Sequence, residues 1–202
     1  TASATLSLIH QEEEQDEISQ ISLSLTKEET EKINHFVRQK GYTLNTIVQG
    51  ALALLVRSDA DVDDIVFGVT VSGRNAEIER VNKMAGLFIN TLPLRVQLHD
   101  GQTLQDVLTN VQQASLDLRE YEYSLLTDIK EVSEIKNTNE LFQSILVFEN
   151  YPIDAQMKEE HEVITLGELH SYEKTNYDLT FIVIPGEELI MRVSYEKRRW
   201  VE

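Results

Sequence analysis

The sequence predicts a mixed α/β protein in which helices pack on a mixed, mostly antiparallel sheet. Two capping boxes precede segments whose apolar residues recur at helical spacing. Several short runs rich in β-branched and aromatic residues are typical of strands. Because helical and strand segments do not alternate strictly, an all-parallel sheet is not expected. A chain of 202 residues is long enough for one full core, and typically buries roughly 70% of its unfolded surface.

The N-terminal part predicts an extended segment followed by a strand and a helix. Residues 1–17 are polar and acidic, and we expect them to be extended. An apolar register over 18–25 predicts the first strand. Thr26 and Glu29 form a capping box, and Gly41 is a typical stop signal. The first helix is therefore expected between these two signals.

The next elements are a buried helix and two strands. Thr43 caps a second helix that is apolar around most of its circumference, which predicts deep burial. A β-branched run over 65–72 predicts a buried strand, in which Gly68 allows close approach of a neighbour. Another strand is expected over 87–98. Within it, Pro93 should mark the end of pairing or the edge of the sheet.

The second half predicts one long helix and four strands. Thr103 and Asp106 form the second capping box, and helical spacing continues to about Tyr121. The remaining apolar runs are too short for helices, and a Pro-Gly pair predicts a hairpin between the last two. The predicted strands are 142–148, 161–169, 177–184 and 188–196.

The composition limits the possible partners and compartments. The chain has no cysteine, so disulfides and thiolate metal ligands are excluded. Its net charge of -17 opposes binding to nucleic acid and to anionic membrane surfaces. There is no apolar run near 18 residues and no signal-peptide pattern, so we expect a cytoplasmic protein with no membrane partner. The chain starts without Met, as a segment of a longer chain would.

The residues alone predict no complete catalytic or metal site. Asp59, Asp61 and Asp63 have the spacing of a calcium loop, but Asp64 and Thr70 stand where the loop needs glycine and glutamate. A solvated turn is the better interpretation. The five histidines are isolated, and there is no glycine-rich phosphate loop or nucleophile motif.

Four separated motifs, taken in order, carry a family resemblance. They read TVSGR (70–74), AGLFINTLPLRV (85–96), ELFQSILVFENYP (140–152) and KTNYDLTFIVIPGEEL (174–189). From about residue 18 to residue 202 the chain resembles the C-terminal half of a condensation domain from nonribosomal peptide synthetases. The resemblance implies one lobe of the chloramphenicol acetyltransferase-like fold.

The resemblance implies an activity that needs a second lobe. In the intact domain, a carrier-bound acyl or peptidyl thioester would be joined to a carrier-bound amine, with phosphopantetheine arms as substrates and no directly bound cofactor. The family's HHxxxDG motif is absent here, so no catalytic residue is assigned and this chain alone is expected to be inactive. The implied partners are the N-terminal lobe and peptidyl carrier domains, and the isolated lobe is expected to self-associate weakly. The alternative is a non-catalytic scaffold or carrier-docking module.

The resemblance places two residues of the strand over 87–98 in a substrate tunnel. These are Asn90 and Thr91, whereas Leu87, Ile89 or Phe88 would face the core according to register. Asn90 is the first choice for contact with the acceptor path. In the alternative interpretation, Asn90 only satisfies neighbouring backbone groups.

The resemblance also implies a floor loop over 72–86. Gly73 and Arg74 would anchor it, although the favoured interpretation of Arg74 is an ordinary structural ion pair. After the long helix the chain reads EYEYSLLTDI (120–129) where many family members have HQDxPFE. This departure leaves the subtype open and the expected fold unchanged.

A second excursion, over 150–172, resembles the family's latch across the tunnel. Tyr151 and Pro152 stand at its start, within the VFENYP motif. That motif favours a condensation domain over the related epimerisation domains. Both excursions are polar and too long for tight turns.

Overall fold

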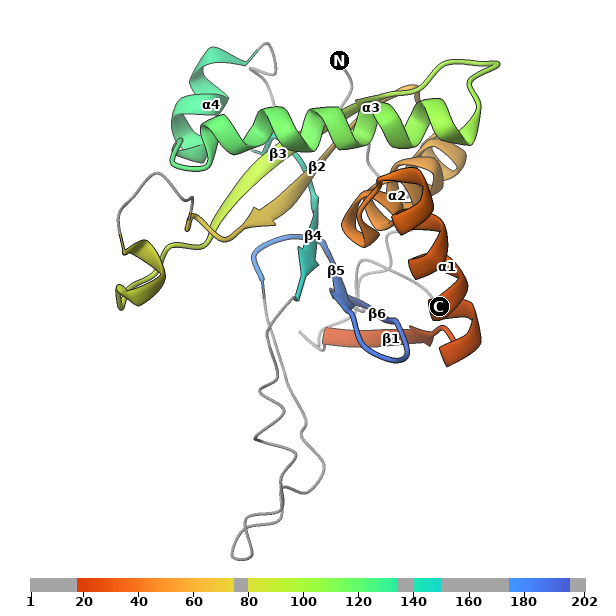
Figure 1. Ribbon diagram of the computed structural model, residues 1–202. Helices are drawn as coiled ribbons and strands as arrows, with labels where there is room; N and C mark the ends of the chain where they lie inside the picture. Colours follow the sequence, from red (N-terminus) through yellow and green to blue (C-terminus); the bar gives the residue numbers. More distant parts are fainter. Residues whose placement is uncertain (1–17, 75–79, 134–139, 150–174, 197–202) are drawn as a thin grey trace, which may run out of the picture.

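A computed structural model describes residues 18–74, 80–133, 140–149 and 175–196, and its centre is one six-stranded sheet (Figure 1). The strand order is β1-β6-β5-β4-β2-β3. The strands are β1 (Ile18–Ser24), β2 (Asp64–Val71), β3 (Asn90–Gln97), β4 (Ser144–Phe148), β5 (Leu179–Ile184) and β6 (Ile190–Glu196).

The sheet is mixed and mostly antiparallel, as predicted. The pairs β1–β6, β5–β6 and β2–β3 are antiparallel. The pairs β2–β4 and β4–β5 are parallel. Strand β2 thus lies between a parallel and an antiparallel neighbour, away from both edges of the sheet.

Three of the four α-helices in the described residues begin where a side chain accepts a hydrogen bond from a free backbone N–H. The four α-helices are α1 (Lys27–Lys40), α2 (Leu44–Ala60), α3 (Leu104–Asp117) and α4 (Leu126–Val132). Two short 3-10 turns, η1 (Val81–Lys83) and η2 (Leu118–Tyr121), complete the set within the described residues. Both predicted capping boxes are present, at the starts of α1 and α3. Helix α4 was not predicted from the sequence.

Strand β2 is buried on both faces. Ile65 and Phe67 are fully buried in the main core, on the face covered by α2 and α3. Figure 1 shows α3 crossing β2 and β3. Val66 belongs to a smaller cluster on the other face, together with Phe142 and Ile145, and α4 packs against it. Helices on both sides of the sheet therefore depend on the apolar run that the sequence predicted as a buried strand.

The start of β3 corrects one prediction. The strand begins at Asn90, because β2 ends at Val71 directly opposite and offers no partner to earlier residues. Leu87 is 89% exposed and Ile89 is 55% exposed, so neither faces the core, whereas Phe88, the other option of the prediction, is partly buried. The predicted strand over 161–169 lies outside the described residues.

Pro93 occupies an edge strand, which was one of its two predicted roles. It pairs with Gly68, and the register continues on both sides of it. Strand β3 is the last strand of the sheet, so its outer side has no partner strand among the described residues. Proline is tolerated there because its missing N–H faces away from the ladder.

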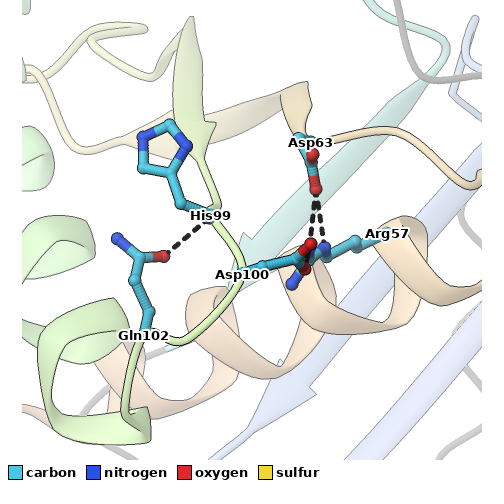
Figure 2. A network of polar contacts seen from close by, with 5 residues as sticks. All are labelled: Arg57, Asp63, His99, Asp100 and Gln102. Carbon is cyan, nitrogen blue, oxygen red and sulfur yellow. Dashed lines mark hydrogen bonds and ion pairs between the residues drawn. The ribbon is translucent and has the colours of Figure 1, made fainter.

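An ionic cluster links the ends of three elements (Figure 2). Arg57, in the last turn of α2, bonds to Asp63 at 2.8 Å and to Asp100 at 2.7 Å. These contacts raise the pKa of the Arg57 guanidinium, chiefly through the bond to Asp100. The side-chain oxygen of Gln102 accepts a hydrogen bond from the backbone N–H of His99 in the same turn. The cluster connects α2 to the start of β2 and to the turn before α3.

We predict that Gly68→Ala destabilises the fold. A Cβ at this position would lie 2.4 Å from a ring carbon of Phe142, which is 1% exposed and stacks on Tyr177. Overpacking of this kind typically costs about 1–3 kcal/mol, measured here as the free energy of urea-induced unfolding. The control is the double variant Gly68→Ala/Phe142→Leu, which should recover part of the loss. Full additivity of the two single losses would contradict this explanation.

We predict that the Asp64–Arg95 pair makes stability depend on acid. Arg95 bonds both carboxylate oxygens of Asp64, at 2.8 and 2.7 Å, and this bonding lowers the pKa of Asp64 below its ordinary 3.8. A carboxyl whose pKa is lowered by folding stabilises the fold at pH values above its unfolded-state pKa. This stabilisation is lost as the pH falls through the folded-state pKa. Asp64→Asn should therefore reduce the unfolding free energy near neutral pH by up to about 1 kcal/mol.

The difference between the two proteins should disappear as the pH falls through the folded-state pKa of Asp64, below which this carboxyl is protonated in both the folded and the unfolded state. Chemical unfolding from pH 7 to pH 2 measures it. Parallel stability curves for the original protein and Asp64→Asn would contradict the assignment.

Candidate functional site

A polar cavity of about 220 Å³ lies at the C-terminal end of β2. Thr70 and Ser72, at the end of that strand and just after it, form one part of its wall. The first two turns of α2 form a second part, and the last turns of α3 with η2 form the third. The cavity is therefore bounded by three elements that meet where the core ends.

The wall formed by α2 is polar, contrary to the apolar circumference expected for this helix. Thr43 caps the helix by accepting a hydrogen bond from the backbone N–H of Thr46. Thr46 and Gln49 are each only 3% exposed. Asn45, between them and the cap, also lines the cavity.

Side-chain hydrogen bonds join this wall to α3. The Ser115 hydroxyl donates to the side-chain oxygen of Gln49 at 2.6 Å. The Thr46 hydroxyl donates to the side-chain oxygen of Gln112 at 3.4 Å. Buried polar groups of this kind need partners, and these pairs supply them across the helix interface. Because these paired side chains are polar, the part of the cavity wall that α2 and α3 form is polar rather than apolar.

Asn90 holds the segment after α3 against the start of β3. Its amide nitrogen donates to the carbonyl oxygens of Glu122 at 2.9 Å and Ser124 at 2.8 Å. Its side-chain oxygen accepts a hydrogen bond from the backbone N–H of Thr91 at 2.9 Å. These contacts belong to the structural alternative for Asn90, and its place in a substrate tunnel stays a prediction. Glu122 itself lines the cavity, so Asn90 fixes part of the cavity wall.

Thr91 lies beside the same cavity. It pairs with Thr70 across β2 and β3, and Thr70 is one of the cavity-lining residues. Both residues are partly buried. The structure thus brings the two predicted tunnel residues to one end of the sheet.

Gly73 and Arg74 anchor the segment between β2 and β3. Gly73 has φ +60, and a Cβ there would lie 1.9 Å from the carbonyl oxygen of Phe88, so only glycine fits. Arg74 donates to the carbonyl oxygens of Val81 and Met84, and its guanidinium lies 4.3 Å from the centroid of the Phe88 ring. Among the described residues, the Arg74 side chain thus contacts two carbonyl oxygens and one aromatic ring.

Two segments expose apolar side chains: one leads into β3, and the other follows α3 and is bonded by Asn90 to the start of β3. We call this surface the apolar rim. Leu87 and Leu125 are among the most exposed members, at 89% and 62%. The apolar rim comprises Met84, Leu87, Ile89, Tyr121, Tyr123 and Leu125.

The other predicted site residues were not placed. Tyr151 and Pro152, with the whole latch-like excursion, lie outside the described residues, as do residues 75–79 of the floor-loop-like excursion. Within the described ranges, no group of three potential ligands is placed to hold a metal ion. No helix in the same ranges has the length and apolar character needed to cross a bilayer.

Sequence reasoning missed Asn45, Gln49 and Glu122 as cavity residues. The available signal was a set of polar residues at Asn45, Thr46 and Gln49 within an otherwise apolar helix, on the side that meets α3. No sequence signal distinguishes Glu122 from the other charged residues around it. Its place at the cavity becomes evident only from the hydrogen bond between its carbonyl oxygen and Asn90.

Known synthetases contain segments similar to this chain. It is 45% identical over 178 residues to one of the linear gramicidin synthase proteins of Brevibacillus parabrevis, covering 88% of the chain and 2% of the relative. It is 35% identical over 183 residues to surfactin synthase subunit 3 of Bacillus subtilis strain 168, covering 90% and 14%. The chain therefore spans a small fraction of the length of these relatives.

Solved structures show the same fold. A four-domain nonribosomal peptide synthetase bound to AMP and glycine matches with a TM-score of 0.78 and 18% identity, over 100% of this chain and 16% of that one. The first condensation domain of the calcium-dependent antibiotic synthetase, in complex with a substrate analogue, matches with a TM-score of 0.72 and 19% identity, over 91% and 41%. The predicted chloramphenicol acetyltransferase-like fold class is confirmed. The family model described as Condensation domain matches residues 2–202, and the chain therefore belongs to the condensation domain family.

Proposed function

We propose that this chain is the C-terminal lobe of a condensation domain that joins amino acids in nonribosomal peptide synthesis. It would supply one wall of the reaction channel and the acceptor side, while the N-terminal lobe carries HHxxxDG, which is absent from these 202 residues. The names of its relatives, synthases of linear gramicidin and surfactin, support this class of reaction.

The observation that carries the proposal is the apolar rim. Large exposed apolar side chains that gather on one part of a surface often mark an interaction site, and the hydrogen bonds of Asn90 tie the two segments of the rim together. The chain covers 41% of a solved condensation domain of similar fold, so more than half of such a domain remains to cover the rim. We assign the rim to contact with that remaining lobe.

The reaction proceeds between two carrier domains whose phosphopantetheine arms enter the channel. The acceptor amine attacks the donor thioester carbonyl, the new C–N bond forms, and the C–S bond breaks. The donor arm leaves as a thiol, and the amine loses one proton, which the histidine of the other lobe would assist. Holding the two tethered substrates in register supplies much of the rate enhancement.

In this scheme the residues of this chain shape the channel. Asn90 and Thr91 belong to its wall, and Asn90 acts on its shape because both of its amide hydrogens are already bonded. Gly73 and Arg74 hold the floor loop over 72–86. Tyr151 and Pro152 would start the latch.

We predict that the 202-residue chain alone forms no amide bond and that adding the separately produced N-terminal lobe restores product formation. Mass spectrometry of the acceptor carrier domain, loaded with its aminoacyl group, measures the product. An N-terminal lobe with the second histidine of HHxxxDG changed to alanine is the control and should restore little activity. Turnover by the chain alone would contradict the proposal, and absence of turnover from the combined native lobes would favour the scaffold or carrier-docking alternative.

The same two-lobe system tests the apolar rim. Leu87→Asp should weaken lobe association at least about tenfold, since a charge would be buried in the contact. Leu104→Asp is the matched control, because Leu104 is 58% exposed at the start of α3 and lies outside the rim. Equal affinities for the two variants would remove the rim from the lobe contact.

We predict that Gly73→Ala impairs condensation more than Gly41→Ala does. Both glycines have positive φ, +60 and +74, and alanine in this region costs roughly 1–2 kcal/mol of stability. Only at Gly73 does a Cβ meet backbone, whereas nothing lies within 4 Å at Gly41. In the intact domain, Gly73→Ala should lower the rate of amide formation at least about tenfold, and Gly41→Ala should leave it nearly unchanged. Thermal unfolding separates the stability losses, and equal rates would contradict a floor-loop role.

A further inference from the structure

Gln49 lines the polar cavity with half of its side-chain amide unpaired. The amide oxygen accepts a hydrogen bond from the Ser115 hydroxyl at 2.6 Å, which directs the oxygen toward α3 and leaves the two N–H groups on the other side of the amide. In the described part of the chain, the nitrogen Nε2 donates to no partner. A buried donor left unpaired costs about 1–3 kcal/mol, so such a group calls for an explanation.

The nitrogen of Gln49 is open to the cavity, although the residue as a whole is only 3% exposed. Within the described ranges, the side-chain atoms that are both sealed from solvent and unpaired are all oxygens. The unpaired nitrogen of Gln49 is therefore reachable by a molecule of the size of water. Because the rest of this residue is buried and the residue lines the cavity, the cavity is the route of that access.

Asn45 presents a second amide on the same side of α2. It lies four residues before Gln49, and side chains at this spacing are neighbours on a helix surface, with Cβ atoms about 5–6 Å apart. Both residues line the cavity. The oxygen Oδ1 of Asn45 is sealed, whereas its nitrogen is not and, among the described residues, donates to no partner. Two amide nitrogens one helical turn apart are thus available at one cavity.

The third side-chain amide of the cavity wall shows the contrasting case. The oxygen of Gln112 accepts a hydrogen bond from the Thr46 hydroxyl at 3.4 Å, and its nitrogen donates to the carbonyl oxygen of Gly41 at 3.1 Å. This amide therefore uses both of its groups within the fold. Asn45 and Gln49 differ, because their nitrogens remain available to a molecule in the cavity.

The start of α2 favours an oxygen acceptor in the same place. Free backbone N–H groups and the helix dipole give a helix N-terminus a partial positive charge. Helices α1 and α3 have acidic residues in their first turns, whereas α2 has none. Asn45 lies in this first turn and Gln49 in the next. The local field and the two amide nitrogens therefore select the same partner, an oxygen atom with lone pairs.

The charged side chains of the cavity wall select an uncharged ligand. Glu122 is partly buried, whereas Arg119, which lines the same cavity, is largely exposed and its charge is screened by solvent. A carboxylate or phosphate would meet the Glu122 charge, but a neutral carbonyl group would not. Resonance makes an amide oxygen the strongest acceptor among neutral carbonyl oxygens, and its two lone pairs allow it to accept from two donors.

The cavity also has room and apolar contacts for the rest of such a ligand. Its volume of about 220 Å³ exceeds by an order of magnitude the roughly 10–15 Å³ that one water needs. Val69, Leu116 and Leu118 lie in its wall beside the polar groups. An amide flanked by short alkyl chains matches this mixture of polar and apolar surface.

We propose that this cavity binds the amide carbonyl group of an uncharged ligand through the side-chain nitrogen of Gln49, with that of Asn45 as the second donor. Binding itself does not depend on the proposed function. The identity of the natural ligand rests on that function, under which both substrates arrive on phosphopantetheine arms that contain amide bonds. The cavity then holds one arm by an amide and helps to set how far its reactive end reaches into the channel.

The test is an NMR titration of the full 202-residue chain, labelled with ¹⁵N, using N-butylacetamide as the probe. Hexanoate is the matched probe, because it has a similar length and carries a negative charge in place of the neutral amide. We expect N-butylacetamide to shift the side-chain amide signals of Gln49 and Asn45. Hexanoate should bind at least about fivefold more weakly, since its charge is repelled by Glu122.

Matched variants identify the donor. Gln49→Leu removes both N–H groups and should weaken N-butylacetamide binding at least about tenfold. Gln113→Leu, the same substitution on an exposed part of α3 outside the cavity, should leave binding unchanged. Ser115→Ala removes the hydrogen bond to Gln49 but keeps the amide, so it should retain more binding than Gln49→Leu. Circular dichroism checks that each variant is folded, and Asn45→Ala, expected to weaken binding about threefold, decides the test if Gln49→Leu does not fold.

Four results would overturn the proposal. They are no shift at saturating N-butylacetamide, which would mean that only solvent fills the cavity; hexanoate binding as tight as that of the amide; unchanged binding in the folded Gln49 and Asn45 variants; and equal losses in Ser115→Ala and Gln49→Leu, which would assign the effect to the contact between the helices. None of them bears on lobe complementation, so failure of this site is distinguishable from failure of the proposed function. Conversely, inactive lobes with intact N-butylacetamide binding would leave the site in place and remove only its assignment to an arm.

Discussion

Burial of β2 on both faces positions almost every other element of the structure. Phe67 on one face and Val66 on the other belong to separate clusters, one covered by α2 and α3 and one by α4. Gly68 belongs to the same strand, and the absence of a side chain there makes room for Phe142. The polar cavity begins where β2 ends. Its position is therefore set by the point at which the helices no longer pack against this strand.

The hydrogen bonds of Asn90 connect the sheet to the segment beside the cavity. One amide group joins the first residue of an edge strand to the two carbonyls that follow α3 and η2. The segment that carries Tyr121, Tyr123 and Leu125 and the backbone of the cavity-lining residue Glu122 consequently share this support. A structural role for Asn90 and an influence on the reaction channel are compatible, because the backbone it fixes forms part of the cavity wall.

Much of the fold was predictable because its signals are local. The capping boxes of Thr26 with Glu29 and of Thr103 with Asp106 depend on residues three apart, and both formed as expected. Helix α4 has seven residues, and Leu125 at its N-cap provides no side-chain bond, so the sequence carries no start signal. Strand β3 starts later than predicted because its partner β2 ends at Val71. This limit comes from strand pairing and cannot be read from the local sequence.

The site was less predictable than the fold. Gln49 and Ser115 lie 66 positions apart, and their 2.6 Å bond exists only after α2 and α3 have packed. From the sequence, Gln49 interrupts an apolar helix without any indication of a partner. The predicted residues Asn90, Thr91, Gly73 and Arg74 did come to one end of the sheet, whereas the cavity beside them forms only where α2 packs against α3.

Pro93 has a consequence for how any companion lobe meets this one. It stands in the middle of the outermost strand β3 and has no N–H to offer. A further strand aligned along that border would find its ladder interrupted halfway. Continuation of the sheet into a neighbouring polypeptide is disfavoured there, so recognition must proceed through side chains, and copies of the lobe are protected from stacking border to border into fibres.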